Sequence, residues 1–302
     1  MGGRGPIAGA ALLPVLALTF NAFTWGVSWW PFRQLETRGL HPLWATALVY
    51  GLAVTVILAW SPRSLGQVLR RPALWVLVAA SGTTNAAFNW GVTIGDVVRV
   101  VLLFYLMPLW AVLLARLLLG ERLTAMAGAR VALALAGAAV VLWPGPEGGW
   151  PVPRTLAEWL GLVGGFSFAL NNVMLRREAH QPEMARALAM FMGGVGVSLA
   201  LATGLSSQGI VPGLPPPGGW VAGAAALALL FLVGNLALQY GAARLPAHTT
   251  AVVMITEVLF ASVSAVLLGA GQVTAPLVFG GALIVGAALL AAWPGPRATL
   301  SA

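Results

Sequence analysis

The fold is decided by apolar runs such as VVRVVLLFYLMPLWAVLLARLLL, which occupies Val97–Leu119. Its 23 residues carry only two charges, Arg99 and Arg116, and each lies within four residues of an end. A helix needs about 20 mostly apolar residues to cross the hydrocarbon core of a bilayer, so this run predicts a membrane-spanning helix. The rest of the chain has the same character, because 59% of the 302 residues are hydrophobic and only 8% are charged. The sequence therefore predicts a protein whose solvent is mostly lipid.

Nine further apolar runs flank this one, separated by connectors rich in Pro, Gly and Arg. The ten predicted spans are Ile7–Trp30, Pro42–Trp60, Ala73–Gly95, Val97–Leu119, Ala125–Trp143, Leu156–Leu175, Met184–Ser206, Trp220–Ala242, His248–Leu268 and Ala275–Trp293. The mean hydropathy of +0.90 agrees with this interpretation. Tryptophan at many of the predicted ends is typical of the lipid headgroup level. The predicted fold class is an all-α membrane protein with ten transmembrane helices.

The composition also excludes several kinds of chemistry. The chain has no Cys and no Lys, which excludes disulfides, thiolate metal sites, a phosphate-loop lysine and a Schiff base. The three His are scattered and do not predict a metal site. The net charge of +8 comes from 16 Arg that lie in short connectors, so binding to nucleic acid is not expected. We expect no cofactor and no enzymatic activity, and the expected partners are membrane lipid and a small-molecule substrate.

The distribution of Arg predicts the orientation in the membrane. With a cytoplasmic N-terminus, the inner side holds 11 Arg and the outer side holds four, while Arg116 lies inside a span. Cytoplasmic loops carry the excess of positive charge, so both termini are predicted to be cytoplasmic. A composition rich in Ala, Leu, Gly and Arg indicates a bacterial source, and the predicted location is the bacterial inner membrane.

An internal repeat divides the chain into residues 1–146 and 147–302. A constant offset of 150 residues relates Asn85, Asn89, Trp90-Gly91 and Trp143-Pro144-Gly145-Pro146 to Asn235, Gln239, Tyr240-Gly241 and Trp293-Pro294-Gly295-Pro296. Each half has five predicted spans, which is an odd number, so the second half is inverted relative to the first. Inverted repeats are typical of secondary transporters that hold substrate near the membrane midplane.

With these features in place, the chain resembles the drug/metabolite transporter superfamily, and within it the ten-helix EamA type. The resemblance covers essentially the whole chain and is carried by Trp25-Gly26, Tyr105-Leu106-Met107-Pro108 and Leu117-Leu118-Leu119-Gly120-Glu121. The second copy departs from the family pattern, because Val258 follows Glu257 where the family usually has Pro. The Tyr-Leu-Met-Pro segment is similar to that of aromatic amino acid exporters. The resemblance implies a secondary transporter that exports amino acids, aromatic ones included, by alternating access.

Polar side chains in the middle of the predicted spans are the candidate substrate contacts, because in lipid they need a partner or a cavity. Together with aromatic neighbours, the candidates are Asn21, Trp25, Ser28, Ser81, Asn85, Asn89, Tyr105, Phe168, Asn171, Asn172, Asn235, Gln239 and Tyr240. Carboxamides both donate and accept hydrogen bonds, so they suit an ammonium and a carboxylate. The alternative is that the same groups hydrogen-bond between helices and touch no substrate.

Four further residues have expected roles. Glu257 is the only carboxylate near the middle of a predicted span, and it is the candidate site for a proton or an ammonium group. The alternative for Glu257 is a protonated carboxyl that hydrogen-bonds across helices. Pro108 is predicted to be a hinge, with a static kink as the alternative. Asp96 and Arg99 are predicted to form an interfacial pair.

Two kinds of alternative function remain open. Within transport, the cargo is a cationic drug or another metabolite such as a nucleoside or a sugar. Outside transport, the chain is an intramembrane enzyme or a receptor, although it lacks the HExxH and GxSxG motifs.

Overall fold

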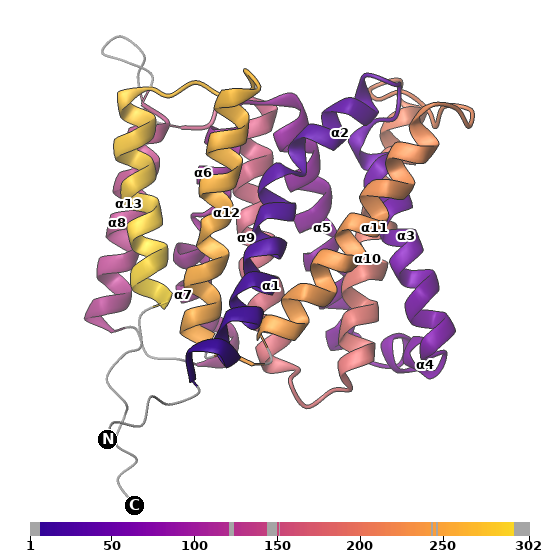
Figure 1. The fold of residues 1–302 in the computed structure, drawn as a ribbon, viewed down its shortest axis with the longest axis horizontal. Helices are drawn as coiled ribbons and strands as arrows, with labels where there is room; N and C mark the ends of the chain where they lie inside the picture. Colours follow the sequence, from indigo (N-terminus) through magenta and orange to yellow (C-terminus); the bar gives the residue numbers. More distant parts are fainter. Residues whose placement is uncertain are drawn as a thin grey trace, which may run out of the picture.

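The computed structural model describes residues 7–120, 124–143, 150, 152–242, 244–245 and 247–292. Over these residues the regular structure is entirely helical, which confirms the all-α part of the predicted class (Figure 1). The ten spans and the inverted repeat stay predictions. The helices are α1 (Ile7–Val27), α2 (Trp29–Glu36), α3 (Pro42–Trp60), α4 (Arg63–Leu69), α5 (Pro72–Ile94), α6 (Val97–Phe104), α7 (Met107–Leu119), α8 (Ala125–Val141), α9 (Leu156–Arg177), α10 (Glu183–Ser207), α11 (Trp220–Ala242), α12 (Ala247–Leu267) and α13 (Ala275–Ala292).

The stretch predicted as one continuous span, Val97–Leu119, consists of two helices with a break at Tyr105 and Leu106. Proline lacks an N–H, and its ring clashes with the carbonyl four residues earlier, which for Pro108 belongs to Phe104. Helix α6 accordingly ends at Phe104, and Pro108 takes one of the first positions of α7, where its missing N–H leaves no bond unmade. The chain therefore breaks before Pro108 and does not bend around it within one helix.

The first span also differs from its predicted extent. Helix α1 ends at Val27 and α2 continues to Glu36, six residues past the predicted end at Trp30. Ser28 sits at the junction, where its Oγ donates to the carbonyl of Trp25 at 2.8 Å. A serine hydroxyl that competes for a backbone carbonyl in this way commonly bends a helix.

Among the described residues, five helical segments are long and apolar enough to cross a membrane. They are Leu12–Glu36, Pro42–Trp60, Val97–Leu119, Glu183–Ser207 and Trp220–Leu238. Three shorter apolar helices accompany them, namely Ala125–Val141, Val253–Leu267 and Ala275–Leu290. Two other long helices, α5 and α9, carry more polar side chains and pack extensively against each other. These segments describe a multi-pass membrane protein.

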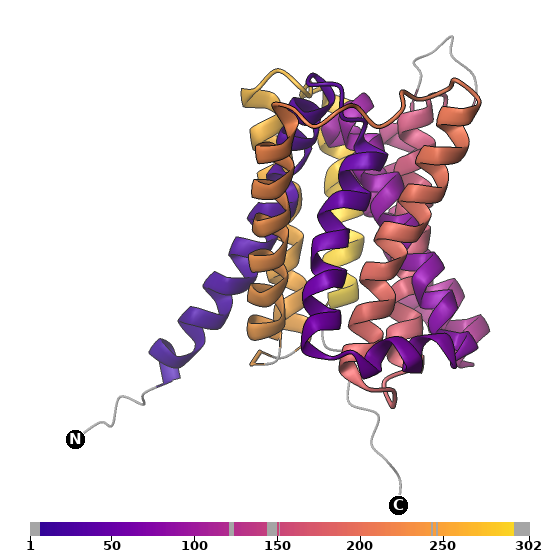
Figure 2. The ribbon, with the colours of Figure 1, turned by 90° about the vertical axis from the view of Figure 1, so that its right-hand side faces the viewer.

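The first residues of α1 and the last residues of α13 lie at the same end of the bundle (Figure 1). The opposite end, named the distal end below, carries the connections α2–α3, α5–α6 and α12–α13. Helix α1 leans away from the other helices toward its start (Figure 2). Its exposed Leu12, Leu13 and Leu16 agree with a lipid-facing surface there.

Glycines allow several helix pairs to touch backbone to backbone. A Cβ placed on Gly137 of α8 would lie 2.6 Å from the carbonyl oxygen of Gly280 of α13, and the reverse distance is also 2.6 Å. On α9, Gly161 faces the backbone of Val100 of α6 in the same manner. Such close approach is the usual function of small residues between membrane helices. Tight packing therefore accounts for the glycine pattern of these helices.

Two connections use the left-handed conformation that favours glycine. Gly120 ends α7 with a φ of 71°, and Gly269 follows α12 with a φ of 69°. A residue with a Cβ would be strained at both positions. The two copies of Trp-Pro-Gly-Pro that help define the sequence repeat lie outside the described residues, apart from Trp143.

Candidate functional site

The predicted polar stripe of α5 is buried and faces α3. Asn85 donates from Nδ2 to the carbonyl of Ser81 at 2.8 Å, and its Oδ1 accepts from the hydroxyl of Tyr50 at 2.5 Å. Asn89 donates from Nδ2 to Oγ1 of Thr46 at 3.0 Å. The two asparagines of the stripe thus form hydrogen bonds to α3.

Tyr50 was not among the predicted site residues, although a signal for it exists. The chain has three Tyr, and a buried phenol generally finds a hydrogen-bond partner for its hydroxyl. Its location in the second apolar run therefore predicts a polar neighbour, but the sequence does not say which one. In the structure that neighbour is Asn85, 35 residues away.

The polar residues of α1 also form internal contacts. Asn21 donates from Nδ2 to the carbonyl of Gly234 on α11 at 2.8 Å, while Ser28 bonds only to its own helix. In the described part of the chain, three buried carboxamide oxygens have no hydrogen-bond partner, and they belong to Asn21, Asn89 and Asn171. A buried acceptor without a donor is energetically costly, so these oxygens retain capacity for a donor group.

Aromatic rings fill the centre of the bundle. Trp25 contacts Phe231 with ring centroids 4.6 Å apart and Phe88 at 6.3 Å. Phe88 in turn contacts Phe104 at 4.9 Å, and Phe104 contacts Phe168 at 5.3 Å. These edge-to-face and tilted contacts run from α11 through α1, α5 and α6 to α9. Tyr105 joins the cluster through Phe104 at 6.1 Å, so three of the predicted aromatic residues, Trp25, Tyr105 and Phe168, take part in one continuous ring cluster.

A small cavity lies beside this cluster. It measures about 20 Å³ and brings Trp25 and Asn235 together with Tyr50, Phe191 and Phe231. This volume holds about one water molecule, whereas ligand pockets typically measure about 300–1,000 Å³. Tyr50 thus connects the two carboxamides that the sequence repeat pairs, because it bonds to Asn85 and lines the cavity with Asn235. This cavity is therefore too small for a metabolite.

Tyr105 and Glu257 meet across the bundle. The Tyr105 hydroxyl lies 3.2 Å from Oε2 of Glu257 and 3.4 Å from the carbonyl oxygen of Met254. Tyr105 is the first residue after α6, so this contact is made at the break in the fourth span. Gly26 of α1 packs against the backbone of Glu257, where an added Cβ would lie 2.8 Å from its carbonyl oxygen. The carboxyl group therefore faces the α6–α7 break, and the backbone of the same residue contacts α1.

Of the remaining predicted site residues, the side chains of Asn171, Asn172 and Tyr240 are described. Asn171 is buried on α9, but its neighbour Asn172 is exposed. Tyr240 lies under the guanidinium of Arg244, 3.8 Å from its ring centroid. The side chains of Gln239 and Pro108 lie outside the described part of the structure.

A much larger cavity of about 830 Å³ opens at the distal end. Its polar lining comes from α2, the α5–α6 connection, α6, the start of α9 and the α12–α13 connection, and it includes Arg33, Glu36, Asp96, Arg99, Glu158 and Gln272. The cavity thus draws residues from both halves of the sequence.

Asp96 organises one wall of this distal cavity. Its Oδ1 accepts from the backbone N–H of Arg99 at 2.9 Å, which caps the N-terminus of α6. Its Oδ2 accepts from the backbone N–H of Gln272 at 3.2 Å, which ties this wall to the α12–α13 connection. The predicted pair of Asp96 and Arg99 therefore exists only through the Arg99 backbone. The reason is that the carboxylate faces the unsatisfied N–H groups of a helix start.

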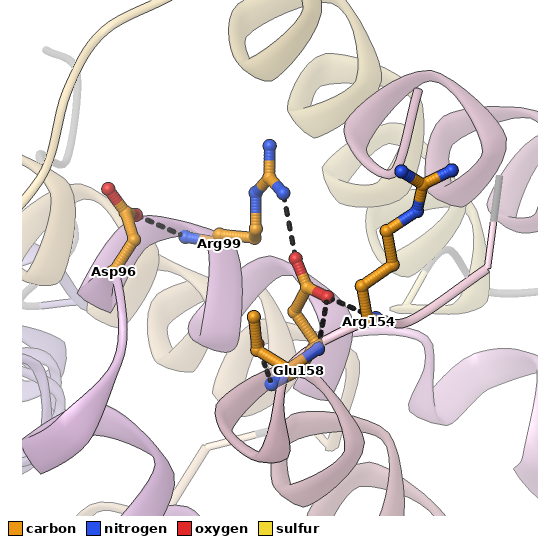
Figure 3. Close-up of polar contacts among 5 residues, drawn as sticks. Asp96, Arg99, Arg154 and Glu158 are labelled. Carbon is orange, nitrogen blue, oxygen red and sulfur yellow. Dashed lines mark hydrogen bonds and ion pairs between the residues drawn. The ribbon is translucent and has the colours of Figure 1, made fainter. Parts of the chain in front are cut away.

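The guanidinium of Arg99 pairs instead with Glu158, with Nη1 and Oε1 2.7 Å apart (Figure 3). The other carboxylate oxygen of Glu158 accepts from the backbone N–H groups of Arg154 at 2.7 Å and Thr155 at 3.1 Å. Thr155 Oγ1 accepts from the Glu158 N–H in return, which completes a capping box at the start of α9. The sequence motif Thr-x-x-Glu signals this cap, but not the ion pair with a residue 59 positions away.

Arg33 forms another wall and serves as a backbone clamp. Its guanidinium donates to the carbonyls of Val92, at 3.1 Å, and Gly95, and it lies over the ring of Trp29 at 5.1 Å. These carbonyls belong to the last turn of α5, where a positive charge is favourable. Arg33 thus joins α2 to the end of α5 beneath the cavity.

His41 lies near this end of the bundle and caps α3. Its Nδ1 accepts from the backbone N–H of Leu43 at 3.3 Å, and its ring packs edge-on against Trp90 at 5.3 Å. Burial lowers the pKa of His41 to about 4, so the imidazole is neutral at pH 7.

Comparisons with known proteins agree with this architecture. Residues 12–143 match the model of the EamA-like transporter family. No curated protein matches the chain. Fourteen chains of solved structures match, and one of them is a crystal structure described only as that of a protein. That structure is 20% identical, covers 94% of this chain and 96% of its own, and has a TM-score of 0.55. The first half of the chain is therefore similar to EamA-like transporters, and the whole chain shares its fold with a solved protein.

Proposed function

We propose that this chain is a secondary transporter of small metabolites, built from ten spans in two inverted repeats of residues 1–146 and 147–302. The single observation that carries the proposal is a symmetry in the helix contacts: a helix of one half packs among helices of the other half, and its counterpart does the reverse. Helix α1 packs against α11 and α12, and its predicted counterpart α9 packs against α5 and the α6–α7 pair. Helices α8 and α13 pack against each other, as two counterparts related by a twofold axis would. Inverted repeats of this kind are characteristic of secondary transporters.

The family match over residues 12–143 supports small-molecule transport, and the Arg distribution supports an inner-membrane location with cytoplasmic termini. In that orientation the distal cavity faces outward. Movement at the α1–α2 and α6–α7 breaks would open the ring cluster and connect the central residues to one side at a time. Discontinuous helices near the midplane are a recurring feature of transporters.

The proposed substrates are amino acids, aromatic ones included, and the proposed direction is export. The support is chemical: Trp25 and Phe168 offer aromatic surface, and the oxygens of Asn21 and Asn89 lack donors that an ammonium group would supply. A cationic solute is the second candidate, favoured by the partly buried carboxyl group of Glu257.

Glu257 is the proposed proton or ammonium site. It is held by a neutral phenol rather than by a described cationic side chain, so its charge state decides how Tyr105 is bonded. A protonated Glu257 donates a hydrogen bond of its own, whereas an ionised one accepts from Tyr105. Either change acts at the break between α6 and α7.

The experiment is uptake and efflux of a labelled amino-acid panel in proteoliposomes, with and without a pH gradient. We expect flux of at least one aromatic amino acid, and Glu257→Gln should remove its response to the gradient. Glu183→Gln, which changes an exposed carboxylate, is the matched control and should leave flux unchanged. Absence of flux for the whole panel would reject the amino-acid assignment, and an unaltered pH response in Glu257→Gln would reject the proton role.

A further inference from the structure

The distal cavity has the size of a ligand site, whereas the centre does not. Its volume of about 830 Å³ lies within the range of small-molecule pockets, and the central cavity holds only about 20 Å³. Its walls are fixed by capping and clamp contacts, so the polar groups that face it are held in place. A solute on its way through the bundle would meet this cavity before or after the closed centre.

The charges of this cavity do not cancel. Arg99 is neutralised by Glu158, and Arg33 donates to the backbone carbonyls of Val92 and Gly95. Two carboxylates remain, Glu36 and Asp96. Both interact electrostatically with the nearby guanidinium of Arg33, but among the described residues neither one has a hydrogen bond or an ion pair with a cationic side chain. Asp96 accepts only from backbone N–H groups, and Glu36 is half-buried at the end of α2. The lining of two Arg and three carboxylates therefore leaves a net negative charge.

We propose that the distal cavity is a recognition site for solutes that carry an ammonium group, with the ammonium held near Glu36 and Asp96. This assignment rests on the proposed transport function and specifies its substrate class. An inorganic ion is disfavoured, because no cluster of three or more His, Cys, Asp or Glu suited to a metal exists among the described residues.

Because the sequence has no Cys, single introduced cysteines can be used to test the electrostatic potential in the distal cavity. Thr37 lines the cavity and is exposed, whereas Gln208 is exposed at the same end but outside the lining. Thr37→Cys and Gln208→Cys are each reacted with two thiosulfonate reagents. One carries a cationic trimethylammonium group and the other an anionic sulfonate group. We expect the ratio of cation to anion labelling rates to be on the order of tenfold higher at Thr37→Cys, because clefts of one charge sign concentrate counter-ions.

Adding Glu36→Gln and Asp96→Asn to Thr37→Cys should bring that ratio down to the Gln208→Cys control. Asn still accepts at a helix start, so the cap of α6 is kept. Equal ratios at Thr37→Cys and Gln208→Cys would overturn the proposal. Thr274→Cys, also in the exposed lining, replaces Thr37→Cys if that variant does not fold.

Ligand protection identifies the chemical class. Labelling of Thr37→Cys by a neutral maleimide is measured with L-phenylalanine, 2-phenylethylamine or 3-phenylpropionate present. The first two carry the ammonium and should slow labelling several-fold, whereas 3-phenylpropionate should not. Protection by 3-phenylpropionate alone, or by none of the three, would overturn the site. Loss of protection with flux intact rejects only this site, and protection without flux rejects only the transport function.

Discussion

The distal cavity and the centre of the bundle differ in charge and in openness, although both lie within one helical bundle. The distal cavity is charged and open, and two of its carboxylates, Asp96 and Glu158, are held by helix starts or by Arg99. The centre is aromatic and closed, and its carboxamides bond to neighbouring helices. An ionised group in the membrane is stable only where water, helix ends or a partner stabilise it, so the centre carries rings, neutral amides and the carboxyl group of Glu257, which Tyr105 contacts. In the proposed transport cycle, the centre would open by movement at the two helix breaks, at Ser28 and at Tyr105–Leu106.

The largest expected effect comes from opening the closed centre. Trp25→Ala removes the ring that joins Phe231 to Phe88, and it should lower the free energy of unfolding by about 3 kcal/mol. Thermal unfolding in detergent measures the change. Trp60→Ala is the control, because that ring is 86% exposed and its loss should change stability little. Equal losses in the two variants would mean that the ring cluster does not hold the centre closed.

The next effect separates the two carboxamides that the repeat pairs. Asn85→Ala leaves the buried Tyr50 hydroxyl without its acceptor, which should cost about 2 kcal/mol. Asn235→Ala should cost less stability, because Asn235 is only partly buried, and should lower flux more than folded yield. Melting temperature, folded yield and flux are compared for both variants. A smaller stability loss in Asn85→Ala than in Asn235→Ala would contradict the assignment of Asn85 to helix contacts.

A smaller effect is expected at the charged end. Glu158→Gln keeps a side chain that can complete the capping box, but it removes the charge that pairs with Arg99. Since the Arg99 side chain is 39% exposed, the loss should not exceed about 1 kcal/mol and should shrink at high salt. Melting curves at low and high ionic strength provide the measurement. A salt-independent loss would show that the cap, and not the ion pair, is what Glu158 supplies.

The smallest effect concerns acid. The pKa of His41 is about 4 in the fold against 6.5 in the unfolded chain, so between these values the unfolded chain binds the extra proton. Stability should therefore fall as the pH drops from 6.5 toward 4. His41→Asn keeps an acceptor for the Leu43 N–H but does not titrate, and the fall should be smaller in this variant. Identical pH profiles of the melting temperature would refute this account.

The sequence predicted those site residues that stand out as polar groups within an apolar span. Glu257 and Tyr105 were selected because polar groups in a span need a partner, and the structure places them in contact. The same rule could not choose between substrate and helix as the partner of Asn85, since both satisfy a carboxamide equally. It also could not find the pairing of Arg99 with Glu158, because the sequence shows a helix cap but not which guanidinium reaches it.

What the sequence alone determined is the helical, membrane-embedded character of the chain, because apolar composition and run length suffice to predict segments that must satisfy their own backbone in lipid. The positions of the helix starts near Pro42, Pro72 and Pro108 follow from local chemistry as well. Tertiary structure alone decided that the centre is closed, that the distal end holds the large cavity, and which polar groups remain without partners. These features depend on contacts between residues far apart in sequence, and no local pattern specifies the packing that creates them.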